Sequence, residues 1–182
     1  MGVKQFYFYK QPDQMDCGPT CLRMLAKHYG RDISLQKLRK LSETTHKGSS
    51  LRTISDAAEN IGFRTLGVKI SYEKLVQEAP LPCIVHWNQY HFIVVYKIQK
   101  DKVFVADPSH GLLKYSKKEF IENWIGSNAN ENTKEGVALL FETTPRLKQS
   151  EIDDIEKKRG FRFLFQYIFR YKKFRTPDLT QN

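Results

Sequence analysis

The spacing of hydrophobic residues changes once along this 182-residue chain, near Gly62. Before that point apolar residues recur every three or four positions, which predicts helices that begin near Cys17, Ser34 and Leu51. After it come short runs rich in valine, isoleucine and aromatic residues, which predict strands. The expected strands are 63–70, 82–87, 91–99, 103–107 and 137–142, with short helical segments after Ser71 and at 117–124. Helices followed by an antiparallel sheet, expected here as a meander, indicate an α+β fold.

The composition is that of a folded protein. Hydrophobic residues make up 40% of the chain and aromatic residues 13%, which excludes a disordered chain. No run approaches the roughly 18 apolar residues of a membrane-spanning helix. The N-terminus lacks the apolar core and cleavage site of a signal peptide. We therefore expect the chain to be soluble as it stands and to begin in the cytosol.

The formal net charge of +10 is unevenly distributed. Residues 157–175 carry eight lysines and arginines and no acid, whereas residues 1–156 hold 22 basic and 19 acidic residues. A basic stretch interleaved with aromatics predicts a helix that docks on a membrane surface or a partner, or an amphipathic helix packed on its own domain. We expect no nucleic-acid partner, because no binding motif accompanies the charge. We therefore expect a folded domain at 1–145, followed by a linker and a basic amphipathic segment at 146–182.

The three cysteines, Cys17, Cys21 and Cys83, form neither a disulfide framework nor a metal-binding pattern, and they indicate a reducing compartment. Cys17 stands at the expected start of a helix, with Asp16 as the expected cap. The free amide groups and dipole of a helix N-terminus stabilise a thiolate, so Cys17 is a candidate nucleophile. The alternative is a small buried hydrophobe, which is the role we expect for Cys21 and Cys83.

A thiolate nucleophile needs a base and a group that orients the base. His86 and His91 flank the predicted hairpin, and spacing does not decide between them. The other three histidines occur in polar helix or loop contexts. Asp107 ends the next strand, which antiparallel pairing brings near the hairpin, although an ordinary Asp-Pro turn would look the same.

Acyl transfer also needs hydrogen-bond donors for the oxyanion. The backbone N–H of Cys17 can supply one donor, and a side-chain amide just upstream can supply the second. Gln11 and Gln14 are both close enough in sequence, so this choice stays open.

Three segments together resemble a known family. The string from Gln11 to Leu22, Gln-Pro-Asp-Gln-Met-Asp-Cys-Gly-Pro-Thr-Cys-Leu, resembles the active-site motif of the double-glycine leader peptidases. His91 followed by Phe-Ile-Val-Val, and Ala-Asp-Pro around Asp107, match later motifs in the same order. These enzymes are papain-like cysteine peptidase domains of bacteriocin- and lantibiotic-exporting ABC transporters. The resemblance covers residues 1 to about 145.

The resemblance implies a role for each candidate residue. Cys17 is the nucleophile, His91 rather than His86 is the base, Asp107 orients the base, and Gln11 stabilises the oxyanion. The implied activity is cleavage of a precursor's leader after a Gly-Gly pair, coupled to export by an ABC transporter, with no cofactor. A relative that binds its substrate without cutting it is the alternative, and a membrane-surface adaptor that works through the basic tail is another.

The resemblance also implies partners and a location. The substrate is a precursor peptide with a double-glycine leader, held in a narrow cleft and an apolar groove. The tail resembles the basic elbow helix that lies along the cytoplasmic face of the bacterial membrane. The sequence has no GxxxxGK[ST] loop, so we expect the transporter's membrane and ATPase domains elsewhere, in the same chain or in a separate one.

Overall fold

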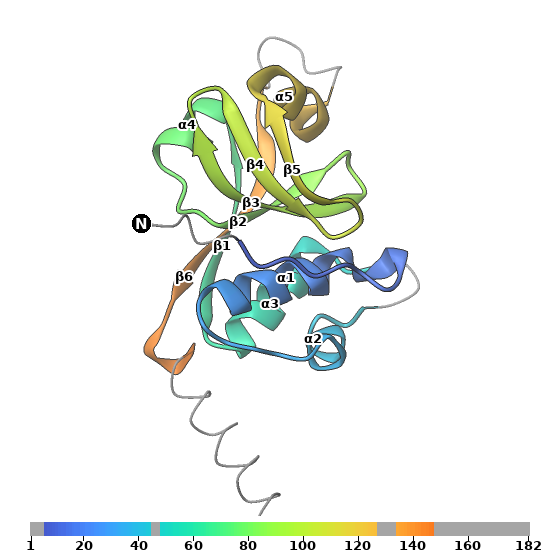
Figure 1. The fold of residues 1–182 in the computed structure, drawn as a ribbon. Coiled ribbons are helices and arrows are strands. Elements are labelled where there is room, and N and C mark those ends of the chain that lie inside the picture. Colours follow the sequence, from blue (N-terminus) through green and yellow to red (C-terminus); the bar gives the residue numbers. More distant parts are fainter. Residues whose placement is uncertain (1–5, 45–47, 127–133, 148–182) are drawn as a thin grey trace, which may run out of the picture.

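A six-stranded antiparallel sheet with helices on both faces forms the body of the protein (Figure 1). The computed structural model describes residues 6–44, 48–126 and 134–147. In chain order the elements are η1 (Gln14–Asp16), α1 (Cys17–His28), α2 (Leu35–Leu41), α3 (Leu51–Asn60), β1 (Phe63–Ile70), α4 (Tyr72–Gln77), β2 (Cys83–Trp87), β3 (His91–Gln99), β4 (Lys102–Asp107), β5 (Gly111–Ser116), α5 (Lys117–Ile125) and β6 (Gly136–Thr143). The predicted α+β class is confirmed.

The order of the strands differs from the expected meander. It is β1-β6-β2-β3-β4-β5, so β2 to β5 follow the chain but β6 lies between β1 and β2. The strand β5 was not expected from the sequence. It is only half-buried along most of its length, so Gly111–Ser116 carries no hydrophobic signal as strong as that of β2 or β3.

The sheet separates two hydrophobic cores. Ile84, Phe92 and Val94 pack with α1, α2 and α3, whereas Val85 and Ile93 pack with α4 and α5. Figure 1 shows the first three helices together at the bottom and α4 and α5 at the top. Because both faces are covered, β2 and β3 are continuous apolar runs rather than alternating ones.

The helices begin and end mostly where the sequence predicts. The Ser34 and Ser71 side chains accept hydrogen bonds from the backbones of α2 and α4, as expected for helix caps. Asp16 is the N-cap residue of α1, as expected, but its carboxylate makes no capping bond to the helix. It accepts instead from the backbone N–H of Asp13, at 3.1 Å, and pairs with the Arg39 guanidinium of α2, with 2.6 Å between Nε and Oδ1.

A thiol hydrogen bond ties α1 to the sheet. Cys21, one turn after Cys17, donates through Sγ to the backbone oxygen of Phe92 at 3.2 Å. Phe92 directly follows His91 in β3, so this contact fixes the distance between the start of α1 and the start of β3. Cys21 and Cys83 are completely buried, which is the core position expected for both.

The predicted basic tail, beyond Leu147, lies outside the described residues, and the division at 145/146 stays a prediction. In the described part of the chain, no helix combines the length and apolar character needed to cross a bilayer.

Candidate active site

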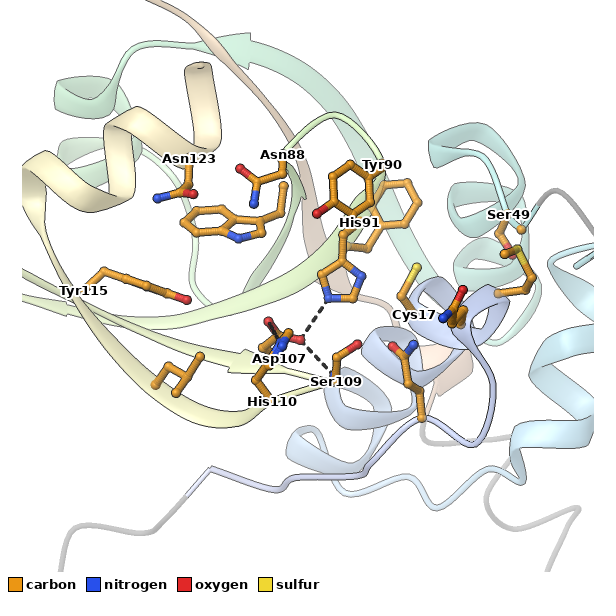
Figure 2. Close-up of a pocket in the computed structure, with 17 residues that line it drawn as sticks. Cys17, Ser49, Asn88, Tyr90, His91, Asp107, Ser109, His110, Tyr115 and Asn123 are labelled. Carbon is orange, nitrogen blue, oxygen red and sulfur yellow. Dashed lines mark hydrogen bonds and ion pairs between the residues drawn. The ribbon is translucent and has the colours of Figure 1, made fainter. Parts of the chain in front are cut away.

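The thiol of Cys17 lies at the N-terminal end of α1, where it faces a cleft between the helices and the sheet (Figure 2). Only 6% of the residue is exposed. α1 meets α3 closely here, since a Cβ at Gly18 would lie 2.6 Å from Cδ1 of Ile54. The amide groups at this helix end, together with its dipole, stabilise negative charge on the sulfur.

The imidazole of His91 stands between Cys17 and Asp107. Val94 of β3 pairs with Ala106 of β4, so the antiparallel register brings the start of β3 and the end of β4 to the same end of the sheet. Nε2 of His91 lies 2.9 Å from Oδ1 of Asp107. The other ring nitrogen faces the Cys17 sulfur (Figure 2). A carboxylate only accepts hydrogen bonds, so Nε2 carries a proton whether the ring is neutral or charged, and Nδ1 is the nitrogen placed to exchange a proton with the thiol.

Burial and hydrogen bonding oppose each other at this pair. Burial by itself lowers the pKa of His91, but its hydrogen bonds to Asp107 and Cys17 outweigh that effect and raise the pKa from 6.5 to about 9. Burial by itself raises the pKa of Asp107, whereas the hydrogen bonds from His91, the Ser109 amide and His110 lower the pKa from 3.8 to about 2. At neutral pH the site therefore favours an imidazolium next to a carboxylate.

His86, the other histidine considered from the sequence, points elsewhere. In the β2–β3 hairpin His86 is paired with Phe92 and Trp87 with His91, and successive strand residues face opposite sides of a sheet. The His86 ring packs on Phe92 with 5.1 Å between ring centroids, and burial lowers its pKa. The structure therefore brings His91, and not His86, to Cys17.

Gln11 and Gln14 both line the cleft, but they are held differently. The backbone N–H of Gln11 donates to the Pro108 oxygen at 2.9 Å, which anchors Gln11 beside the end of β4. Its side-chain oxygen is buried, and no described residue hydrogen-bonds to it. Gln14 is exposed on the short 3-10 helix η1. The backbone of Gln11 is therefore tied to the end of β4, and its side chain is the more buried of the two.

The cleft around these residues has a volume of about 930 Å3. Its wall on the helical side includes Gln14, Met15, Gly48 and Ser49, and its wall on the sheet side includes Trp87, Tyr90, Leu113, Tyr115 and Asn123. The described residues contain no cluster of three or more His, Cys, Asp or Glu side chains that could hold a metal ion.

Two contacts of the site were missed from the sequence. His110 donates to the second oxygen of Asp107, although its loop context gave no reason to single it out. The three-residue spacing of Asp107 and His110 in a turn is the signal that could have found it. The pair of the buried Asp16, directly before the thiol, with the partly exposed Arg39 had no sequence signal because the two residues are 23 positions apart.

Comparison with known proteins agrees with this arrangement. Residues 5–131 match the family described as the Peptidase C39 family. The chain belongs to this family. Among curated C39 relatives it is 37% identical, over 167 residues, to the lactococcin-G-processing and transport ATP-binding protein LagD of Lactococcus lactis. That alignment covers 89% of this chain and 22% of the relative. The colicin V secretion/processing ATP-binding protein CvaB of Escherichia coli is 29% identical over 131 residues, which cover 68% of this chain and 19% of that one. The C39 chain thus spans about a fifth of the length of these relatives.

Solved structures of proteases from ABC transporters share the fold. A double-glycine motif protease from an AMS/PCAT transporter, solved with its leader peptide, superposes with a TM-score of 0.69 at 27% identity, covering 77% of this chain and 93% of that one. The peptidase domain of Streptococcus ComA, a bi-functional ABC transporter, gives a TM-score of 0.68 at 28% identity, covering 77% of this chain and all of that one. The resemblance stated from the sequence is therefore confirmed for the family and the fold.

Proposed function

We propose that this C39 domain is a cysteine endopeptidase that cuts the leader from a secreted precursor peptide after a Gly-Gly pair. The main support for the proposal is the alignment of three side chains at one end of the sheet. The Cys17 thiol begins a helix and faces one ring nitrogen of His91, whose other nitrogen lies 2.9 Å from the Asp107 carboxylate. Nucleophile, base and orienting acid are the parts that thiol-dependent acyl transfer requires.

In the proposed reaction the site starts as a thiolate–imidazolium pair, with the Cys17 proton already on Nδ1 of His91. The thiolate attacks the carbonyl carbon of the second glycine, and the resulting oxyanion accepts hydrogen bonds from the Cys17 N–H and the Gln11 side-chain amide. His91 returns the proton to the departing amine, which leaves a thioester on Cys17 and frees the mature peptide. Water, deprotonated by His91, then hydrolyses the thioester, and the leader departs with a C-terminal glycine. Asp107 keeps the imidazole oriented in both halves of the reaction.

The substrate and partners follow from the relatives. One solved neighbour is named a double-glycine motif protease in complex with a leader peptide, and the curated relatives are named for processing and transport of peptides such as lactococcin G. We assign this chain the same class of substrate, with cleavage coupled to export by transporter membrane and ATPase domains in the same or a separate chain. The protein then works at the cytoplasmic face of the bacterial membrane.

The domain division belongs to the same proposal. We assign residues 1–145 to the peptidase, since the family match ends at residue 131 but β6 extends to Thr143. We assign residues 146–182 to a linker and a basic segment on the membrane surface. Co-sedimentation with anionic liposomes, with and without residues 157–182, tests this assignment. Equal binding by both chains contradicts it.

Incubation with a synthetic leader peptide that contains Gly-Gly, followed by mass spectrometry, tests the activity. We expect one cut after the second glycine and no cut in a peptide with valine at that position. Cys17→Ala should abolish cleavage, while Cys83→Ala, which removes a thiol buried in the other core, should retain it. If Cys17→Ala cuts as fast as the parent, the mechanism is wrong. Leader binding without turnover, with Cys17 inert to iodoacetamide, would instead support a domain that only binds its substrate.

A further inference from the structure

The carboxylate of Asp107 is held from two sides. Oδ1 accepts from Nε2 of His91 at 2.9 Å and from the Ser109 amide at 2.8 Å. Oδ2 lies 2.9 Å from Nδ1 of His110, which follows in the turn between β4 and β5. Figure 2 shows His110 next to Asp107 at the wall of the cleft. Asp107 is buried, with 4% of its side chain exposed, whereas 71% of the His110 side chain is exposed.

The direction of the third hydrogen bond follows from charge. Asp107 is ionised at neutral pH, since its surroundings lower its pKa to about 2. A carboxylate has no proton to give, so His110 is the donor and carries a hydrogen on Nδ1, whether its ring is neutral or protonated.

This third bond matters because a carboxylate rotates easily. The torsion that turns the oxygens of aspartate is broad, and both bonds to Oδ1 leave Oδ2 unconstrained. Among the described residues, the hydrogen bond to Oδ2 comes from His110. Fixing Oδ2 fixes the carboxylate plane, and this plane sets the direction in which Oδ1 holds Nε2 of His91.

We propose that His110 is a positioning residue, which acts through Asp107 to hold the imidazole of His91 in line with Cys17. The inference rests on the proposed peptidase function, and it assigns His110 no contact with the substrate. It explains why an exposed histidine keeps a fixed partner at the edge of the cleft. A side chain at the surface thus takes part in orienting a base of which only 13% is exposed.

The test compares His110→Ala with His110→Asn in the full chain. The side-chain amide of asparagine can place an N–H where Nδ1 of histidine stands. We expect His110→Ala to lower kcat about threefold to tenfold with KM unchanged, as for loss of one hydrogen bond to a charged group at an exposed position. His110→Asn should restore most of the rate. His28→Ala, at an exposed histidine near the far end of α1, is the matched control and should retain the parent rate.

A measurement without substrate separates this inference from the proposed function. The proton on Nε2 of His91 should give a low-field proton resonance, which should broaden or vanish in His110→Ala and return in His110→Asn. An unchanged resonance and kcat in His110→Ala, or an asparagine variant as impaired as the alanine variant, overturns the positioning role. If the parent fails to cut a Gly-Gly leader peptide, the proposed function fails, and the resonance alone decides the role of His110.

Discussion

Replacing Asp107 by asparagine tests the charge that the structure places beside His91. Burial lowers the pKa of His91, and the hydrogen bonds and charges of Asp107 and Cys17 raise it to about 9. Asparagine keeps an oxygen acceptor of similar shape but removes one of these negative charges, while burial remains. A neighbouring opposite charge changes a pKa by about 1–3 units, so we expect the pKa of His91 to fall by roughly two in Asp107→Asn.

The magnitude follows from the fraction of His91 that is protonated. A pKa lower by about two reduces the imidazolium fraction roughly tenfold near pH 8 and barely changes it near pH 6. The alkaline limb of the kcat/KM profile should therefore move to lower pH, and the variant should lose far more activity near pH 8 than near pH 6. The assay is leader-peptide cleavage across this pH range.

The control is Asp101→Asn, which removes the same charge from an exposed turn between β3 and β4. Its profile should match that of the parent. If the alkaline limb of Asp107→Asn coincides with the parent's, or if activity falls by the same factor at both pH values, then Asp107 does not set the charge of His91.

The same variant should alter the pH dependence of stability. His91 has a folded-state pKa above its ordinary 6.5, so its contribution is full below pH 6.5 and is lost as the pH rises through about 9. The pKa of Asp107 is lowered from 3.8 to about 2, so its contribution is present above pH 3.8 and is lost as the pH falls towards 2. The lowering of the Asp107 pKa corresponds to about 2 kcal/mol of folding stability. This value describes the contacts of the carboxylate better than the raised pKa of His91 does, because the hydrogen bond and charge of Cys17 also contribute to the His91 pKa. Urea unfolding near pH 6 should show that Asp107→Asn lowers the free energy of unfolding by about this amount relative to the parent. The difference should be smaller near pH 9.

Three further predictions concern the surroundings of the site. Gln11→Ala should lower kcat about 100-fold to 1,000-fold with little change in KM, as for loss of an oxyanion donor, whereas Gln14→Ala should retain the parent rate in the same assay. Arg39→Ala removes the guanidinium partner of the Asp16 carboxylate, whose side chain is 2% exposed. Urea unfolding should show that the free energy of unfolding falls by about 1–3 kcal/mol, and Arg39→Lys should recover only part of this loss. Gly62 and Gly30 both have positive φ, at +103° and +90°, so alanine strains the backbone at either position. Gly62→Ala should destabilise the protein more, because a Cβ at Gly62 would lie 2.5 Å from a backbone atom whereas a Cβ at Gly30 would meet nothing within 4 Å. Equal melting temperatures for the two glycine variants would contradict the last prediction.

Features set by neighbours in the chain could be predicted from the sequence. Helix starts at Ser34 and Ser71 follow from side chains that cap the backbone three residues later, which is a local interaction. The β2–β3 hairpin follows from two apolar runs separated by a short polar turn. The positions of His91 and Asp107 at one end of the sheet follow from antiparallel pairing of consecutive strands.

Features that depend on distant segments could not be predicted. The insertion of β6 between β1 and β2 depends on packing across the whole domain, and nothing local in 136–143 encodes it. Asp16 looked like a helix cap because the local pattern fits one, but a guanidinium 23 residues away competes for its carboxylate. Spacing also left His86 and His91 open, because only the register of the hairpin tells which side of the sheet each ring occupies.

The place of β6 has a consequence for biosynthesis. Among the described strands, β1 pairs only with β6. The ribosome must therefore make the chain from Ile70 to Gly136 before β1 finds this neighbour, a delay of about 3–13 seconds at translation speeds of 5–20 residues per second. A chain terminated at residue 131, where the family match ends, would carry Cys17, His91 and Asp107 yet leave two strand edges without hydrogen-bonding partners. Open edges of this kind recruit other chains, so the expected fate of such a product is aggregation.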